Sequence, residues 1–217
     1  MLRKALLACG ILSSILYVTM VVGIGFQWNG YNWTSQTISE LSAIDAPTRR
    51  PWLIAGALYT VLVVAFGRGV WVSAGSRVNL RRAGEAIVVY GLLGLLWPLA
   101  PMHLREVLAA GGATASDTMH LVLASVTVSL MLVGMLFATT AFDGRFRRFS
   151  IATLVVLCVF GALTFLDAPA VGENLPTPWL GLWERINLGA FLLWVAALAI
   201  ELWRMPVARP VQTAVQL

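Results

Sequence analysis

Charge is scarce in this sequence. Only 12% of its 217 residues are charged, whereas 59% are hydrophobic, and an ordinary soluble domain has about 25% charged residues. A chain of this size could not hide so much apolar surface, because its exterior must be covered by groups that water tolerates. The composition therefore excludes a soluble globular domain and a disordered chain. It predicts an all-α, polytopic membrane protein.

Cysteine is scarce as well, and several functional motifs are missing. The two cysteines, Cys9 and Cys158, lie inside apolar runs, where a free thiol behaves as a small hydrophobic group. No disulfide framework is therefore expected. The first apolar run continues from Ala5 to Phe26, so we interpret it as a retained transmembrane helix and not as a cleaved signal peptide. The sequence has no glycine-rich phosphate loop, nucleophile elbow or haem-attachment motif, and it predicts no cofactor-binding residues of these kinds.

Long apolar runs are abundant. A helix needs about 20 mostly apolar residues to cross a bilayer, and six runs approach or exceed this length. They cover residues 5–26, 52–74, 86–101, 118–142, 151–166 and 181–205. We predict a bundle of six transmembrane helices in one domain, residues 1–205, followed by a short C-terminal cytoplasmic tail, residues 206–217. Glycines in these runs should let helices approach closely; they are Gly91, Gly94, Gly134, Gly161 and Gly189.

Basic residues gather at one end of the predicted bundle. The end that carries both termini has Arg3, Lys4, Arg77, Arg81, Arg82, Arg145, Arg147, Arg148, Arg204 and Arg209. The positive-inside rule then places both termini in the cytoplasm. The net charge of +5 is thus a topology signal and not a nucleic-acid-binding patch. We expect a multi-pass protein of the bacterial cytoplasmic (inner) membrane that contacts membrane lipids, and nothing in the sequence defines an oligomeric state.

Polar residues gather at the opposite, outer end. In the first outer loop, Thr37 and Glu40 have the spacing of a capping box, which predicts a short helix lying along the membrane surface. Glu40 is then either a capping acid or a site residue. Trp28, Tyr31 and Trp33 are typical of anchors at the membrane interface.

Asp117 and His120 are three residues apart at the start of the helix predicted over 118–142, so they share one face. With His103 from the preceding loop they offer two histidines and a carboxylate, which is enough for a catalytic zinc site with an open position. A divalent metal such as zinc is therefore one hypothesis for a cofactor. The alternative is structural, with Asp117 capping the helix and His120 lying at the interface.

Glu184 and Arg185 lie about one turn inside the last predicted helix. Ionisable residues in membrane helices usually face the protein interior or a cavity, because exposing them to lipid is costly. Arg185 is long enough to reach the interface, but Glu184 is short. We expect Glu184 to pair with Arg185, Arg105 or His120, either as a structural ion pair or as part of a site.

Four short segments carry a resemblance to a known family. They are SQTISEL at 35–41, PMHLR at 101–105, DTMH at 117–120 and GLWERIN at 181–187. In these motifs, in their order and over nearly its whole length, the chain resembles the DUF998 family of bacterial integral membrane proteins. The resemblance implies six helices and recurring polar positions at Glu40, His120, Glu184 and Arg185, and it implies no particular activity. Many members have a Phe-Pro-x-Asp-Pro-type segment after the third helix; residues 97–103 read WPLAPMH here, so the role of that acid does not carry over.

Three classes of function remain open. The first is a pocket at the outer end that binds a small molecule or lipid, or that hydrolyses it with the help of a metal. The two histidines and Asp117 would then hold the metal, and Glu40, Glu184 and Arg185 would be the catalytic residues, with a carboxylate as base. The second is a transporter of a small or amphiphilic solute, against which the few polar residues at mid-depth argue. The third is a structural or partner-binding subunit whose polar cluster only joins the helix ends.

Overall fold

The computed structural model describes residues 1–206, which form helices and connecting loops without any strand. Its elements are α1 (Leu2–Gly25), the 3₁₀ helix η1 (Ser39–Ser42), α2 (Arg49–Ser73), α3 (Val78–Leu93), the 3₁₀ helix η2 (Trp97–Leu99), α4 (Arg105–Ala109), α5 (Ala115–Ala141), α6 (Gly144–Gly172) and α7 (Leu180–Arg204). Apart from Pro206, the predicted tail 206–217 lies outside the described residues.

Six stretches are long and apolar enough to cross a membrane: α1, α2, the stretch Val78–Leu99 that contains α3 and η2, α5, α6 and α7. This confirms the predicted all-α, multi-pass architecture. The helices predicted over 86–101 and 151–166 were too short, because hydropathy falls at the basic residues that precede them. Backbone hydrogen bonds nevertheless continue through such residues. In the first turns of α3, for example, Arg81 and Arg82 are exposed while Leu80 and Ala83 are buried.

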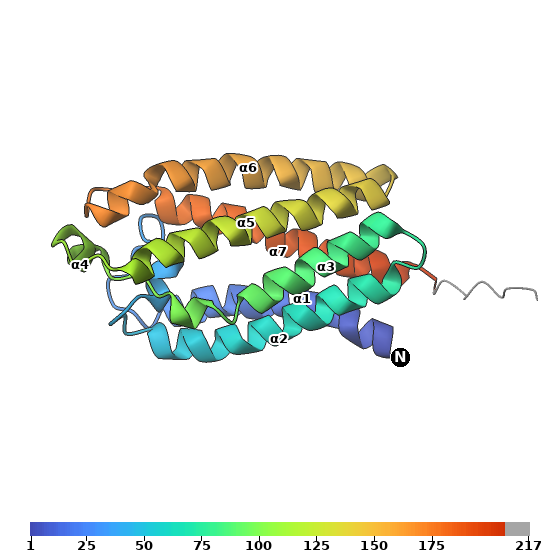
Figure 1. Cartoon of the computed structure of the whole chain (residues 1–217), viewed down its shortest axis with the longest axis horizontal. Helices are drawn as coiled ribbons and strands as arrows, with labels where there is room; N and C mark the ends of the chain where they lie inside the picture. Colours follow the sequence, from blue (N-terminus) through green and yellow to red (C-terminus); the bar gives the residue numbers. More distant parts are fainter. Residues whose placement is uncertain (207–217) are drawn as a thin grey trace, which may run out of the picture.

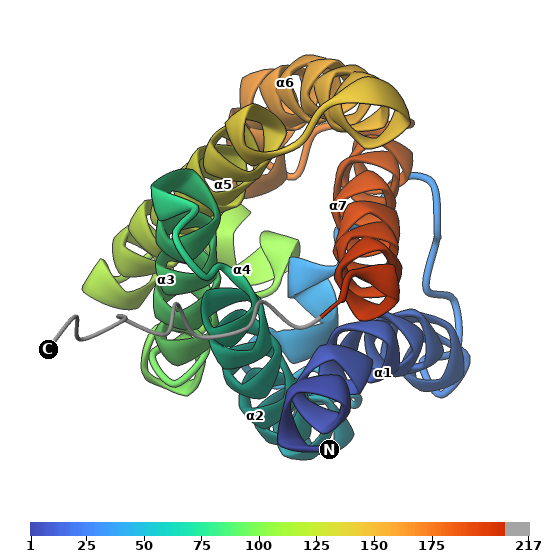
Figure 2. The same ribbon diagram turned by 90° about the vertical axis from the view of Figure 1, so that its right-hand side faces the viewer.

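The six long helices form a closed ring in chain order. Each packs against the next, and α7 closes the ring by packing against α1; Figure 2 looks along this ring from one end. The first residues of α1 and the last of α7 lie at the same end, on the right in Figure 1. We call this end the terminal end, and the opposite end, which carries the loops 26–48, 94–114 and 173–179, the loop end. Their sidedness in a membrane stays a prediction.

Large apolar side chains fill the ring in its terminal half. Leu7, Phe66, Met135, Trp194 and Leu198 belong to one core cluster and are fully buried. They come from four different helices, so this half of the interior is a packed core that holds the ring together. The loop-end half is built differently and contains a cavity.

Helices α2 and α3 approach closely because both helices have glycines at their contact. A methyl group on Gly84 would lie 2.7 Å from the backbone N of Trp71, and one on Gly91 would lie 2.8 Å from Val64 Cγ2. The close approach predicted for Gly91 is thus confirmed. The same prediction for Gly189 is wrong, because a methyl group there would meet nothing within 4 Å.

We predict that Gly84→Ala lowers the free energy of unfolding by about 1–3 kcal/mol, since α2 and α3 must separate to admit the methyl group. The matched control is Gly23→Ala on α1, where the added group meets nothing within 4 Å and only helix propensity changes, by about 1 kcal/mol in favour of alanine. Unfolding of both variants in a mild detergent, followed by helical circular dichroism, measures the difference. Equal stability of the two variants would contradict the tight α2–α3 contact.

Candidate functional site

Residues 26–48, which we call the first loop, fold back into the loop end of the ring. In Figure 2 the first part of this segment runs along the outside of α1 and α7, and only its light-blue later part, around η1, lies within the ring. Ile38, Leu41 and Thr48 are buried, with exposed fractions of 3%, 0% and 0%. The predicted short helix exists as η1, but it lies among the helices and not along the membrane surface. Tyr31, predicted as an interfacial anchor, is buried as well.

Glu40 joins the first loop to itself and to α4. The predicted capping box is present, because Thr37 N donates to Glu40 Oε2 at 2.7 Å and Glu40 N donates to Thr37 Oγ1 at 3.2 Å. Arg105 also donates two hydrogen bonds of 2.9 Å to the same carboxylate, from Nε to Oε1 and from Nη2 to Oε2. Glu40 is fully buried by these partners, an arrangement typical of a structural carboxylate.

Arg105 holds all three loops of the loop end. Besides Glu40, its Nη1 donates to Thr177 Oγ1 at 3.2 Å and its Nη2 donates to the Ser35 carbonyl at 3.4 Å. Thr177 Oγ1 in turn donates to the same carbonyl at 2.9 Å. One guanidinium on the second loop therefore ties the first loop to the third. Because these partners are far from Arg105 in sequence, no local pattern predicted that Arg105 joins the loops.

Arg185 fixes the first loop from the side of α7. Its Nη1 donates to the carbonyls of Gln36 (2.9 Å) and Gly181 (2.7 Å), and its Nη2 donates to the Tyr31 hydroxyl. The guanidinium also lies 5.3 Å from the ring centroid of Trp33. Burial raises the pKa of the Tyr31 hydroxyl well above its usual value, so Tyr31 keeps the proton that it donates to the Thr37 carbonyl at 2.6 Å.

Glu184 differs from its neighbour. The expected ion pair is absent: within residues 1–206, no basic side chain forms a salt bridge with it. Its Oε2 accepts a hydrogen bond from the backbone N of Ile38 instead. The carboxylate thus contacts the first loop and also forms part of a cavity wall.

The three predicted metal ligands divide into two groups. Asp117 accepts hydrogen bonds from His103 N (2.7 Å) and Thr114 N (2.8 Å), and its Oδ2 lies 2.9 Å from His103 Nδ1. It completes a capping box with Thr114 at the start of α5, which confirms its predicted capping role. His120 forms no hydrogen bond with either residue, and its Nδ1 bonds to the Ala100 carbonyl at 2.9 Å instead. In the described part of the chain, no group of three or more His, Cys, Asp or Glu side chains is placed to hold a metal ion.

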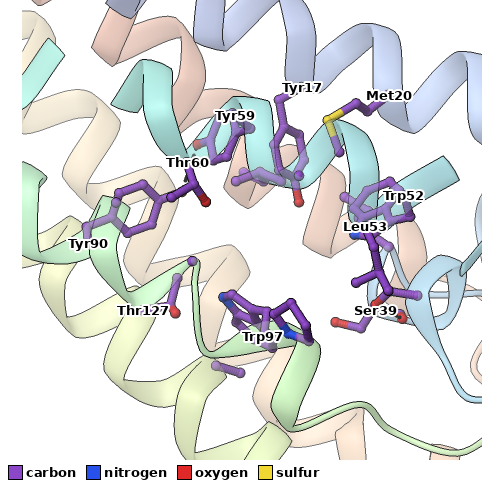
Figure 3. A pocket seen from close by; sticks show the side chains of 18 of the residues that line it. Tyr17, Met20, Ser39, Trp52, Leu53, Tyr59, Thr60, Tyr90, Trp97 and Thr127 are labelled. Carbon is purple, nitrogen blue, oxygen red and sulfur yellow. Dashed lines mark hydrogen bonds between the residues drawn. The ribbon is translucent and has the colours of Figure 1, made fainter. Parts of the chain in front are cut away.

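A cavity of about 290 Å³ lies beneath the first loop, inside the loop-end half of the ring. Figure 3 shows aromatic side chains around it; those that line it are Tyr17, Trp52, Tyr59, Tyr90 and Trp97. The hydroxyls of Tyr59 and Tyr90 are 2.8 Å apart and share one hydrogen bond. The first loop contributes Ile38, Ser39 and Ser42 and closes the cavity at this end.

Polar groups on the cavity wall are only partly satisfied. His120 is 5% exposed and lines the cavity, and its Nε2 has no hydrogen-bond partner within residues 1–206. The same holds for Thr127 Oγ1 on the next turns of α5. Of the buried side-chain polar atoms in the described chain, only these two and Arg185 Nε lack a partner. Two of the three therefore belong to residues of one wall.

The cavity reaches the side of the ring between α2 and the chain that follows α3. Ala57 on α2 and Leu95 after α3 both line it, and both are exposed, Leu95 to 59%. Helix α3 ends at Leu93, and α2 continues past this level to the loop end. The opening thus lies on a surface that faces lipid when the helices span a membrane.

Sequence reasoning missed most of this wall. It singled out Glu184 and His120, but not the aromatic side chains or Thr127. A signal was present, because tyrosine in membrane helices favours the interface, whereas Tyr17, Tyr59 and Tyr90 lie well inside the apolar runs. Tyrosines at such depth need polar partners within the protein.

We predict that Arg105→Gln lowers the free energy of unfolding by about 3–5 kcal/mol, because it leaves the buried Glu40 carboxylate without its cation. The control is Arg147→Gln on α6, whose contact with Asp143 is 3.9 Å long and exposed and should leave stability close to that of the wild type. Thermal unfolding in detergent checks both. A stable Arg105→Gln protein would mean that the first loop does not depend on this pair.

One of three comparisons with known proteins found a match. A family model described as a protein of unknown function, DUF998, matches residues 11–201. No curated protein and no solved structure matches the chain. The family match includes all six long helices in whole or large part, the three loops of the loop end and every residue of the cavity wall named above. Because it extends over most of the sequence, the chain belongs to the DUF998 family.

Proposed function

We propose that this membrane protein binds an amphiphilic small molecule or lipid in the cavity beneath the first loop. The observation that carries the proposal is the composition of the wall, which is mostly aromatic and apolar but includes two polar atoms without partners, His120 Nε2 and Thr127 Oγ1. Small-molecule pockets share this composition, with apolar walls and a few polar groups that fix orientation, and they start at about 300 Å³.

The unpartnered atoms support a bound molecule on energetic grounds. A buried polar atom without a hydrogen bond costs about 1–3 kcal/mol. A cavity of about 290 Å³ is many times larger than the roughly 10–15 Å³ that one water needs. A molecule with a polar head and an apolar remainder would satisfy the polar atoms and also cover the aromatic wall.

The position of the opening supports an amphiphile over a water-soluble ligand. Ala57 and Leu95 border the cavity on the lateral surface of the ring, so a molecule could enter from the lipid phase between α2 and the segment after α3. The first loop closes the cavity at the loop end. Phe66, Trp194 and Leu198 fill the interior in the terminal half, which favours a pocket with one opening over a passage for transport.

Acid–base chemistry on the bound molecule is a second candidate, favoured by one observation. Glu184 and His120 both line the cavity, whereas Glu40 and Arg185 are engaged in holding the first loop. A carboxylate and a histidine that face one substrate would provide a base and an acid. Hydrolysis with the help of a metal would need these side chains to rearrange. His103 and Asp117 hydrogen-bond to each other, and His120 bonds to the Ala100 carbonyl instead.

We further propose that the protein lies in the bacterial inner membrane with its loop end outward. The basic residues near the terminal end support this orientation, since Arg and Lys gather on the cytoplasmic side of membrane proteins. The cavity would then take its ligand from the outer half of the bilayer.

We predict that Gly56→Phe abolishes ligand binding. Gly56 lines the cavity and a Cβ added there would meet nothing within 4 Å, so we expect a phenyl ring at this position to occupy the cavity. The probes are dodecanol, dodecanoate and dodecylamine, added to protein in a non-ionic detergent. A probe at about 100 times its Kd should stabilise the wild type by about 2.7 kcal/mol, a rise of about 5 °C or more in Tm, and should leave Gly56→Phe unchanged.

Gly23→Phe is the control for this experiment, because Gly23 is exposed on α1 and its added side chain also meets nothing within 4 Å. It should respond to the probes as the wild type does. If no probe stabilises the wild type more than Gly56→Phe, the cavity is not a binding site. A purely structural role of the polar cluster would then be the better account.

A further inference from the structure

Two ionisable side chains of the cavity wall offer hydrogen-bond acceptors. Glu184 contributes a carboxylate and His120 contributes a ring nitrogen. We propose that the ligand is an amphiphile whose head group carries an ammonium group, with Glu184 as its counter-ion and His120 Nε2 as a second acceptor. This inference rests on the proposed function, because it names the chemistry of the molecule that the cavity binds.

Glu184 is a carboxylate without a cation in the described chain. Among residues 1–206 it forms no salt bridge. The guanidinium of Arg185, next to it in sequence, is turned to the Gln36 and Gly181 carbonyls and to the Tyr31 hydroxyl. A carboxylate inside a membrane protein normally has a partner, and a ligand ammonium group in the cavity would supply one.

His120 has one ring nitrogen without a hydrogen-bond partner among residues 1–206. A carbonyl oxygen can only accept, so the 2.9 Å contact between His120 Nδ1 and the Ala100 carbonyl places the proton on Nδ1. In the neutral ring Nε2 is then an acceptor, and it has no partner. The edge-to-face contact with Trp97, 4.9 Å between ring centroids, fixes the plane of the imidazole. His120 Nε2 is thus a second acceptor without a donor, on a residue that lines the cavity.

Aromatic side chains form much of the same cavity wall. Tyr17, Trp52 and Trp97 surround the space in Figure 3, and Tyr17 packs edge-on against Trp52 with centroids 5.8 Å apart. Electron-rich ring faces attract cations, and the attraction is strongest where water is excluded. Their presence beside an unpaired carboxylate favours a positive head group over a neutral or negative one.

Arg49 is the one arginine or lysine on the described wall. Its contribution to binding would distinguish a simple alkylamine from a phosphoethanolamine lipid. Its Nη1 donates to the Ser42 carbonyl at 2.7 Å, which leaves other N–H groups of the guanidinium for an anion. A simple alkylamine would use Glu184 and His120 alone. A zwitterionic phosphoethanolamine lipid would in addition place its phosphate near Arg49.

The experiment ranks head groups on one chain length. Dodecylamine, dodecylphosphoethanolamine, dodecanol and dodecanoate are titrated into the full-length protein in a non-ionic detergent, and Kd is measured by quenching of tryptophan fluorescence. We expect the two amines to bind at least tenfold more tightly than dodecanol and dodecanoate. Hydrogen bonds to charged groups contribute about 1.5–3 kcal/mol, so Glu184→Gln should weaken amine binding about 10- to 100-fold and leave dodecanol binding unchanged.

Glutamine keeps an acceptor for Ile38 N, so Glu184→Gln retains the contact with the first loop. The control is Glu106→Gln on α4, which removes the same charge from an exposed residue of the loop end and should leave every Kd unchanged. Tighter binding of the phosphoethanolamine, lost in Arg49→Gln, would identify a zwitterionic lipid. Equal binding of the two amines would identify a simple amine.

Two outcomes would overturn the ammonium inference and leave the proposed function intact. One is binding of dodecanol or dodecanoate as tight as that of the amines, still abolished by Gly56→Phe. The other is unchanged amine affinity in Glu184→Gln. Failure of all four probes to bind in a way that Gly56→Phe abolishes would instead overturn the proposed function itself. The ranking on the wild type needs no variant, so it stands even if Glu184→Gln fails to fold.

Discussion

Non-helical backbone inside a ring of membrane-spanning helices needs hydrogen-bond partners, because neither lipid nor an apolar core provides them. The first loop meets this constraint with side chains from distant segments. Arg105 on α4 binds the Ser35 carbonyl, Arg185 on α7 binds the Gln36 carbonyl, and Glu184 accepts from Ile38 N. The loop can therefore lie within the ring instead of over it. Its position in turn closes the cavity beneath it.

The same constraint separates the charged residues of the loop end into two kinds. Glu40 and Arg105 neutralise each other with two hydrogen bonds of 2.9 Å and are buried together. This pair stabilises the loop and has little capacity left for a ligand. Glu184, by contrast, accepts from the backbone of the first loop and lines the cavity. Both carboxylates lie inside the protein. The presence or absence of a cation partner distinguishes the structural role of Glu40 from the proposed binding role of Glu184.

The ring also explains why the cavity lies in one half only. In the terminal half, glycines bring α2 and α3 together and large side chains from several helices fill the interior. In the loop-end half, α3 ends at Leu93 and the chain continues into η2. Aromatic side chains line the cavity in this half. A ring of helices of unequal length thus produces a pocket without any dedicated domain.

The sequence by itself determined the membrane, the six crossings and the capping roles of Glu40 and Asp117, because hydropathy and helix caps depend on residues close together in the chain. It also indicated that Glu184, Arg185 and His120 are unusual. Only the tertiary structure decided their partners: Arg185 binds the Gln36 carbonyl, 149 residues away in sequence, Glu184 has no cation among residues 1–206, and His120 bonds to Ala100 and not to the other predicted metal ligands. The cavity was beyond reach for the same reason. Its wall combines side chains from α1, α2, α3, α5, α7 and two loops, and no local pattern encodes which of them meet.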